Sequence, residues 1–188
     1  MVSVERMRLV ELCNRADRAW HEHRRDDARR DLHEAIARGR MDGDVKEMKQ
    51  SLALLGQIER DDRNLVEAMA CYEELVALHL AHDDLVGVAL ALRHLGDVHR
   101  ENSASELAAV CYQEAMAIYD AHTDAPPLDV ANALRSFAVC QQETGEADEA
   151  RELWQAARNI YSALGVGASV RECDERLGDL QDVLAMAG

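Results

Sequence analysis

Hydrophobic residues recur at intervals of three and four along almost the whole chain, which is the period of an amphipathic α-helix. In residues 4–22, for example, Ala16, Ala19 and Trp20 share one face, and acids and arginines occupy the other. Polar or glycine-containing breaks separate such stretches, and no alternating run of strand length appears. We therefore predict an all-α protein of antiparallel helix pairs.

One group of residues recurs at a period of 40 to 42 residues. Its clearest copy is Leu95 and Gly96, followed by Ala108 and then Tyr112. The other copies are Leu55, Gly56, Ala68 and Tyr72; Phe137, Ala138, Ala150 and Trp154; and an unfinished one that begins at Leu177 and Gly178. Small residues let two helices cross closely, and a ring one turn beyond the alanine fills the space between successive pairs. Leucine in place of Gly96 or Ala108 should destabilise the fold by about 1–3 kcal/mol, whereas we expect replacement of Asp97 to matter little.

The breaks divide the chain, which we treat as one domain over residues 1–188, into repeats and a capping helix. The repeats are expected at about 4–40, 44–82, 84–122 and 127–165, and the capping helix at 168–187. The first repeat lacks the Leu-Gly pair, and its second helix is expected to end near Arg38, where Gly39 and Gly43 follow. Glu175, Asp179 and Asp182 suit the exposed side of a terminal helix.

Several helix starts carry capping signals. Side-chain capping is predicted for Asn64 with Glu67, Ser103 with Glu106, and Ser169 with Glu172. Pro127 suits a first helical turn, where no backbone amide hydrogen is needed.

The recurring residues resemble those of the tetratricopeptide repeat (TPR) family, whose pattern combines Leu-Gly, a small alanine and an aromatic residue. The longer period is similar to that of kinesin-light-chain-like repeats, and the resemblance covers roughly residues 4–187. Leucines stand where the family pattern has tryptophan, namely Leu52, Leu92 and Leu134, and the closing proline is absent. The resemblance implies a right-handed α-solenoid of about four repeats, whose concave groove is lined by the first helix of each pair and binds a peptide or a helix.

Matching positions on the first helices give a candidate partner-binding groove. Its residues are Gln50, Leu54, Gln57, Leu90, Arg93, His94, Asp97, Asn132, Arg135, Ser136 and Val139. Arg93 and Arg135 fall in register, so they could pair with a carboxylate or phosphate of a partner. The alternative is that both neutralise nearby acids. If the first interpretation holds, an acidic segment is the ligand, binding weakens with salt, and reversing both charges weakens it at least about tenfold with little loss of stability.

Composition narrows the partners and the location. The formal net charge of −15 disfavours nucleic acid, and no long apolar run indicates a membrane span. The N-terminus has acids and arginines where a signal peptide would be apolar, so we expect a cytoplasmic protein. The five cysteines contain no CxxC pair, and we interpret them as reduced thiols.

The sequence contains no pattern that indicates catalysis. It has no glycine-rich phosphate loop, GxSxG or HExxH motif, and its paired histidines lack a third metal ligand, so we expect no cofactor and no metal. The favoured function is a non-catalytic protein-binding scaffold. Alternatives are a self-associating structural unit, such as a homodimer formed through the helix that carries Trp20, and a regulatory fragment of a larger signalling protein; an enzyme is the least favoured.

Overall fold

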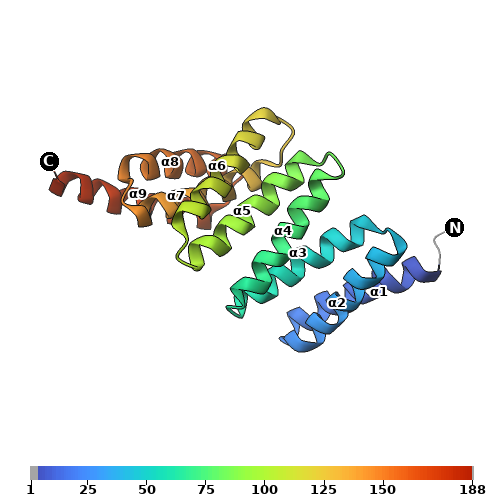
Figure 1. The fold of residues 1–188 in the computed structure, drawn as a ribbon. Coiled ribbons are helices and arrows are strands. Elements are labelled where there is room, and N and C mark those ends of the chain that lie inside the picture. The colour runs from blue at the N-terminus through green and yellow to red at the C-terminus, as the bar shows by residue number, and fades with distance from the viewer. Residues whose placement is uncertain (1–3, 188) are drawn as a thin grey trace. The chain divides into compact units, whose positions relative to one another are not determined.

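The computed structural model describes the backbone of residues 4–187 and the side chains of residues 9–181. This part of the chain forms nine α-helices and no strand: α1 Val4–His21, α2 Arg25–Asp42, α3 Val45–Asp61, α4 Leu65–Leu80, α5 Leu85–Glu101, α6 Ser105–Ala121, α7 Pro127–Thr144, α8 Ala147–Ala163 and α9 Gly167–Ala187. The prediction of an all-α fold is confirmed. The helices fall into two compact units, α1–α4 up to Asp84 and α5–α9 from Leu85 onward (Figure 1).

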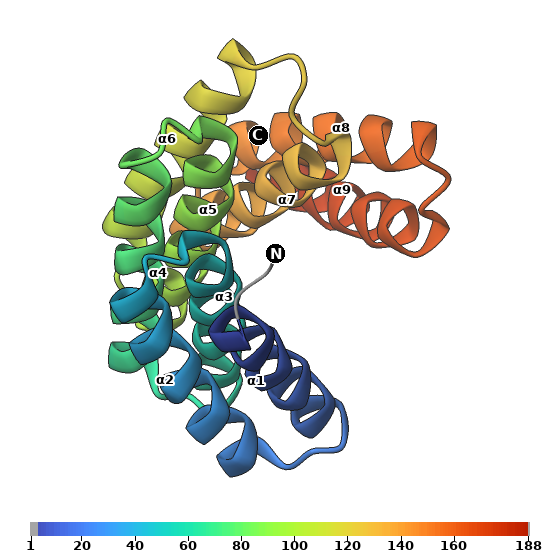
Figure 2. The ribbon, with the colours of Figure 1, turned by 90° about the vertical axis from the view of Figure 1, so that its right-hand side faces the viewer.

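In the first unit, two antiparallel helix pairs stack on each other. Helix α1 contacts α2, α3 contacts α4, and both α1 and α2 contact α3 (Figure 2). A partly buried ion pair joins the two pairs, because Arg29 Nε of α2 donates to Glu59 Oε1 of α3 at 2.9 Å. Asn64 also donates to the second oxygen of Glu59, at 2.7 Å, so this buried carboxylate has both oxygens engaged.

In the second unit, α5 and α6 pair, α7 and α8 pair, and α9 packs on α8. Trp154 of α8 is fully buried, in a cluster that includes Leu134 of α7 with Cys173 and Leu180 of α9. Helix α9 therefore occupies, on α7 and α8, the place that the first helix of a further pair would take.

The recurring glycines make room for the recurring tyrosines. A Cβ atom on Gly56 would lie 2.8 Å from Tyr72 Cζ, and one on Gly96 would lie 2.7 Å from Tyr112 Cε1. Both contacts are shorter than real Cβ contacts, so a hydrogen atom is the largest substituent that the rings accept. The predicted close crossing is thus a contact between a glycine and the ring of its own pair.

Tyr112 also reaches the next helix pair. Its ring lies 5.8 Å from that of Phe137 on α7, measured between centroids, and Cys140 joins the same cluster. The prediction that a large ring fills the space between successive pairs is confirmed here. Asp97, by contrast, is buried and accepts a hydrogen bond from the Tyr112 hydroxyl at 2.8 Å. The expectation that its replacement matters little was therefore wrong.

The three predicted capping boxes are not formed. Ala104, not Ser103, is the N-cap of α6, and Ser103 has a positive φ of 61°. Asn64 is the N-cap of α4, but its side chain bonds Glu59 instead of capping the helix. Ser169 lies inside α9, which begins at Gly167.

Two glycines behave differently from the prediction. Helix α2 continues through Gly39 and ends at Asp42, with Gly43 in the left-handed conformation at φ 69°. Gly39 is buried where α2 meets α3, and an added Cβ would collide with Met48. Gly178 is exposed and lies at no crossing.

Pro127 occupies the first turn of α7 as expected. Glu175 and Asp179 are exposed on α9 as expected, and the side chain of Asp182 lies outside the described residues.

Candidate binding surfaces

A hollow of about 420 Å³ lies between the first helices of the two pairs in the first unit. Helix α3 contributes Gln50 and Leu54, two of the predicted groove residues. The complete lining is Cys13, Asn14, Asp17, Leu32, Gln50, Ser51, Ala53 and Leu54. Apolar side chains beside amide, hydroxyl and carboxylate groups give this hollow the mixed character of a peptide-binding surface.

The residues that α1 contributes to the hollow were missed by the sequence analysis. Cys13 and Asn14 stand 40 residues before Ala53 and Leu54, so the repeat period carries the signal that could have found them. The degenerate first repeat lacks Leu-Gly, which hid the correspondence. The Cys13 sulfur lies 3.3 Å from Ser51 Oγ, and this contact links α1 to α3 within the lining of the hollow.

In the second unit, Arg93 lies inside a network on α5. Its Nη1 donates to Asp97 Oδ2 at 3.2 Å, and its Nη2 lies 2.8 Å from His94 Nε2. Only 14% of the Arg93 side chain is exposed. Because Asp97 also accepts from Tyr112, this arginine is connected to the recurring tyrosine of its own repeat.

Arg135 of α7 pairs with Glu172 of α9. Its Nε and Nη2 donate to the two carboxylate oxygens at 2.8 and 2.7 Å, a bidentate geometry. These hydrogen bonds raise the pKa of Arg135, and the negative charge of Asp97 adds to the effect. Arg135 is 40% exposed, so the pair remains accessible to solvent. Both arginines thus have an acidic partner within the chain, which agrees with the interpretation that they neutralise nearby acids.

The other predicted residues of the second unit are spread over α5 and α7. Asn132 accepts a hydrogen bond from the Tyr161 hydroxyl at 2.8 Å, and Ser136 is buried. Leu90 and Val139 are partly exposed. In the first unit, Gln57 donates to Asp61 on its own helix and does not line the hollow. Glu172 and Tyr161 were not predicted, because their pairing with α7 depends on how α8 and α9 fold back on it.

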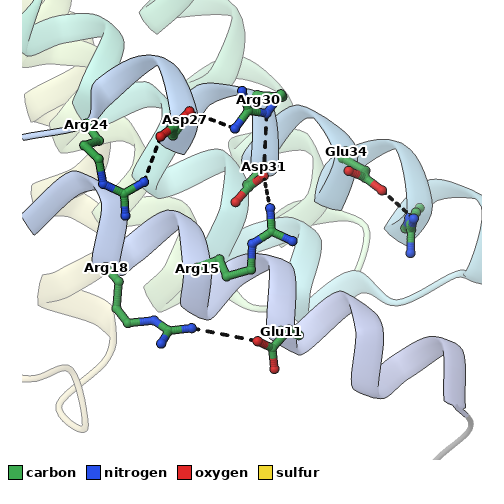
Figure 3. Close-up of polar contacts among 9 residues, drawn as sticks. Glu11, Arg15, Arg18, Arg24, Asp27, Arg30, Asp31 and Glu34 are labelled. Carbon is green, nitrogen blue, oxygen red and sulfur yellow. Dashed lines mark hydrogen bonds and ion pairs between the residues drawn. The ribbon is translucent and has the colours of Figure 1, made fainter. Parts of the chain in front are cut away.

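A network of ion pairs connects residues of α1 and α2 on one face of this helix pair (Figure 3). Arg15 donates a hydrogen bond to the buried Asp31 at 2.8 Å. Asp27 accepts hydrogen bonds from Arg24 at 2.7 Å and from Arg30 at 2.8 Å. Together with Arg18, Ala19 and Glu22, these residues line a polar hollow of about 240 Å³. Apart from Ala19, every residue that lines this hollow is charged.

The described residues contain no group of three or more His, Cys, Asp or Glu side chains arranged to hold a metal ion. Burial raises the pKa of Cys71 to about 12 and those of Cys111 and Cys173 to about 11, so these thiols remain protonated near neutral pH. Among the helices described, none combines the length and the apolar character needed to cross a bilayer.

Comparison with models of known protein families gives no match, and no curated protein sequence matches the chain. Solved structures are similar in fold. A protein from Podospora anserina assigned as a kinesin light chain, with nearly identical TPR-like repeats, aligns with a TM-score of 0.66 and 16% identity over 93% of this chain and 95% of its own.

Two further structures align over nearly the whole chain. The MamA protein has a TM-score of 0.59 and 16% identity, over 95% of this chain and 94% of its own. BtubC (BKLC) from P. vanneervenii has a TM-score of 0.55 and 12% identity, over 97% and 93%. The paired helices, the glycine–tyrosine contacts and these alignments together show that the chain has the fold of a tetratricopeptide-type helical repeat protein.

Proposed function

We propose that this protein is a non-catalytic scaffold that binds a peptide segment of a partner protein. The observation that carries the proposal is the hollow between α1 and α3, where half-buried Leu54 lies beside exposed Gln50 and Asn14. An extended peptide needs apolar contacts for its side chains and polar groups for its backbone, and this lining supplies both. All five cysteines are free thiols, in keeping with the reducing cytoplasm, where we place the protein.

Selection of peptides from a random library on the 188-residue protein would test this proposal. Peptides that bind should lose at least about tenfold in affinity to Leu54→Arg, because the substitution places a charge in the apolar part of the hollow. Val66→Arg is the matched control, since Val66 of α4 is 70% exposed and lies outside the hollow. Equal loss in both variants, or no loss in either, would refute the hollow as the binding site.

We propose further that the second unit contributes to this function by binding an acidic segment. Arg135 is the accessible cation, and a partner carboxylate could replace Glu172 in its bidentate bond. Binding would then weaken as salt rises. Three other predicted groove residues of the second unit, Leu90, His94 and Val139, would supply the surrounding contacts.

The test for the acidic ligand uses Arg135→Gln with Glu172→Gln. This double variant removes the cation without leaving a lone charge, so the fold is retained. Arg93→Glu is unsuitable, because it would put a carboxylate beside buried Asp97; the structure contradicts the expectation that reversal at this position leaves stability unchanged. Binding that depends neither on salt nor on the double variant would refute an acidic ligand and leave an apolar helix, bound through Leu90 and Val139 of the second unit, as the alternative.

A further inference from the structure

The tripeptide Leu-Gly-Asp occurs twice, at residues 95–97 of α5 and at residues 177–179 of α9. In the first copy it forms a socket for a tyrosine. The ring of Tyr112 lies against Gly96, and the Tyr112 hydroxyl donates to Asp97 at 2.8 Å. Tyr112 comes from α6, the helix that follows α5 and packs on it.

The second copy has the same residues without a ring. Gly178 is exposed, and no described atom lies within 4 Å of the position that its Cβ would take. Asp179 is exposed as well. Leu177 packs against the core cluster around Trp154, as part of the attachment of α9 to the fold. The leucine therefore packs partly buried against the fold, while the glycine and the aspartate are exposed.

A hollow of about 520 Å³ lies beside this second copy, between α8 and α9. Its lining includes Gln155 and Ala156 of α8 with Leu177 and Gln181 of α9. Gln181 stands 40 residues after Gln141 of α7, whose side chain donates to Glu149 of α8 at 2.6 Å. In the pair formed by α7 and α8, Gln141 thus faces the second helix. The hollow accordingly lies on the side of α9 where a second helix would pack.

We propose that α9, together with α8, is a docking site for a helix of a partner protein that carries a tyrosine. The ring of this tyrosine would cover Gly178 and its hydroxyl would donate to Asp179, as Tyr112 does at Gly96 and Asp97. An alanine four residues before the tyrosine would allow close approach, as Ala108 does on α6. This surface is distinct from the hollow between α1 and α3, so it does not depend on the function proposed above.

The probe for this site is a stapled, fluorescently labelled helix with the sequence of residues 105–121, because that helix fills the equivalent socket in this chain. Fluorescence anisotropy with the 188-residue protein should show saturable binding. Gly178→Ala should weaken it by about tenfold, since a Cβ would occupy the place of the ring. Alanine favours helix over glycine, so this variant should fold at least as well as the wild type. Gly167→Ala, at the other glycine of α9, is the matched control and should bind as the wild type does.

A second variant tests the hydroxyl contact. Asp179→Ala should weaken binding of the tyrosine helix by about threefold or more, and should have little effect on a helix with phenylalanine at that position. Equal binding to Gly178→Ala and wild type would overturn the proposal, because the probe would then bind elsewhere, for instance by displacing α6. Absence of saturable binding would also overturn it. Dimerisation of the wild type that Gly178→Ala abolishes would identify a second copy as the occupant and would overturn the assignment to a separate partner.

Discussion

Gly96→Ala and Gly178→Ala each add one methyl group to a helix, and they should change the free energy of unfolding in opposite directions. At Gly96 the new Cβ would lie 2.7 Å from Tyr112 Cε1 and 3.0 Å from both Cδ1 and Cζ. The ring cannot move aside freely, because it is fully buried, contacts Phe137 and is held by Asp97. At Gly178 the same methyl group would meet no described atom within 4 Å.

The expected magnitude follows from two opposing effects. Alanine in place of glycine stabilises a helix by about 1 kcal/mol at either position. Overpacking a tight core contact costs about 1–3 kcal/mol. Gly178→Ala should therefore raise the free energy of unfolding by up to about 1 kcal/mol. Gly96→Ala should lower it by up to about 2 kcal/mol, and the two variants should differ by about 1–3 kcal/mol, which isolates the packing effect.

Urea unfolding followed by far-ultraviolet circular dichroism measures this difference. The midpoints should move in opposite directions while the slope with denaturant stays constant. Gly56→Ala, which meets the ring of Tyr72 at 2.8 Å, serves as an independent repetition and should behave like Gly96→Ala. If Gly96→Ala is as stable as Gly178→Ala, the socket is not closed around the ring, and the argument from glycine to tyrosine fails.

Three further predictions concern Asp97, the buried cysteines and the partly buried His79. Asp97→Ala should lower the free energy of unfolding by about 1–3 kcal/mol, because it leaves the Tyr112 hydroxyl buried without its acceptor. Urea midpoints measure the loss, and a midpoint equal to that of the wild type would refute the prediction. Cys71 and Cys111, whose raised pKa values keep them protonated, should react with a thiol reagent at pH 8 far more slowly in the native protein than in urea, and equal rates would contradict the burial. Burial lowers the pKa of His79 below its ordinary 6.5, so the unfolded chain binds a proton at this histidine more readily than the folded protein does. The free energy of unfolding should therefore fall as the pH drops below about 6.5. Urea midpoints at pH 5.5 and 7.5 measure this dependence, and His79→Gln should remove the part that His79 contributes.

The fold was accessible from the sequence because its main determinants are local and repeated. The helical period and the polar breaks predicted a repeat at about 84–122, where α5 and α6 lie, and the recurrence of Leu-Gly with a later tyrosine identified the helix pairs. Helix starts were less predictable. Serine or asparagine followed by glutamate favours a capping box in isolation, but in this protein Asn64 bonds Glu59 and Glu172 bonds Arg135. Both side chains thus bond a residue of another helix instead of capping their own.

The candidate groove was predictable only in part, for a related reason. A helical wheel shows which residues share a face, and Gln50 and Leu54, which it put on the groove side of α3, line the hollow between α1 and α3. It does not show which charges meet across helices. Arg135 and Glu172 are 37 residues apart, and their pairing depends on α9 folding onto α8. The contribution of Cys13 and Asn14 was hidden because the first repeat lacks the Leu-Gly pair.

The two copies of Leu-Gly-Asp show how far a repeat pattern determines structure. On α5 and on α9 the leucine packs against the fold, because the helical period places it on the inner face. The glycine and the aspartate have different surroundings, since their contacts come from the next helix and not from their own. Asp97 is buried because Tyr112 lies over it, whereas Asp179 is exposed where no described ring does. An identical tripeptide therefore stabilises the interior on α5 and forms a surface for recognition on α9, and the segment that packs against it decides which of the two it becomes.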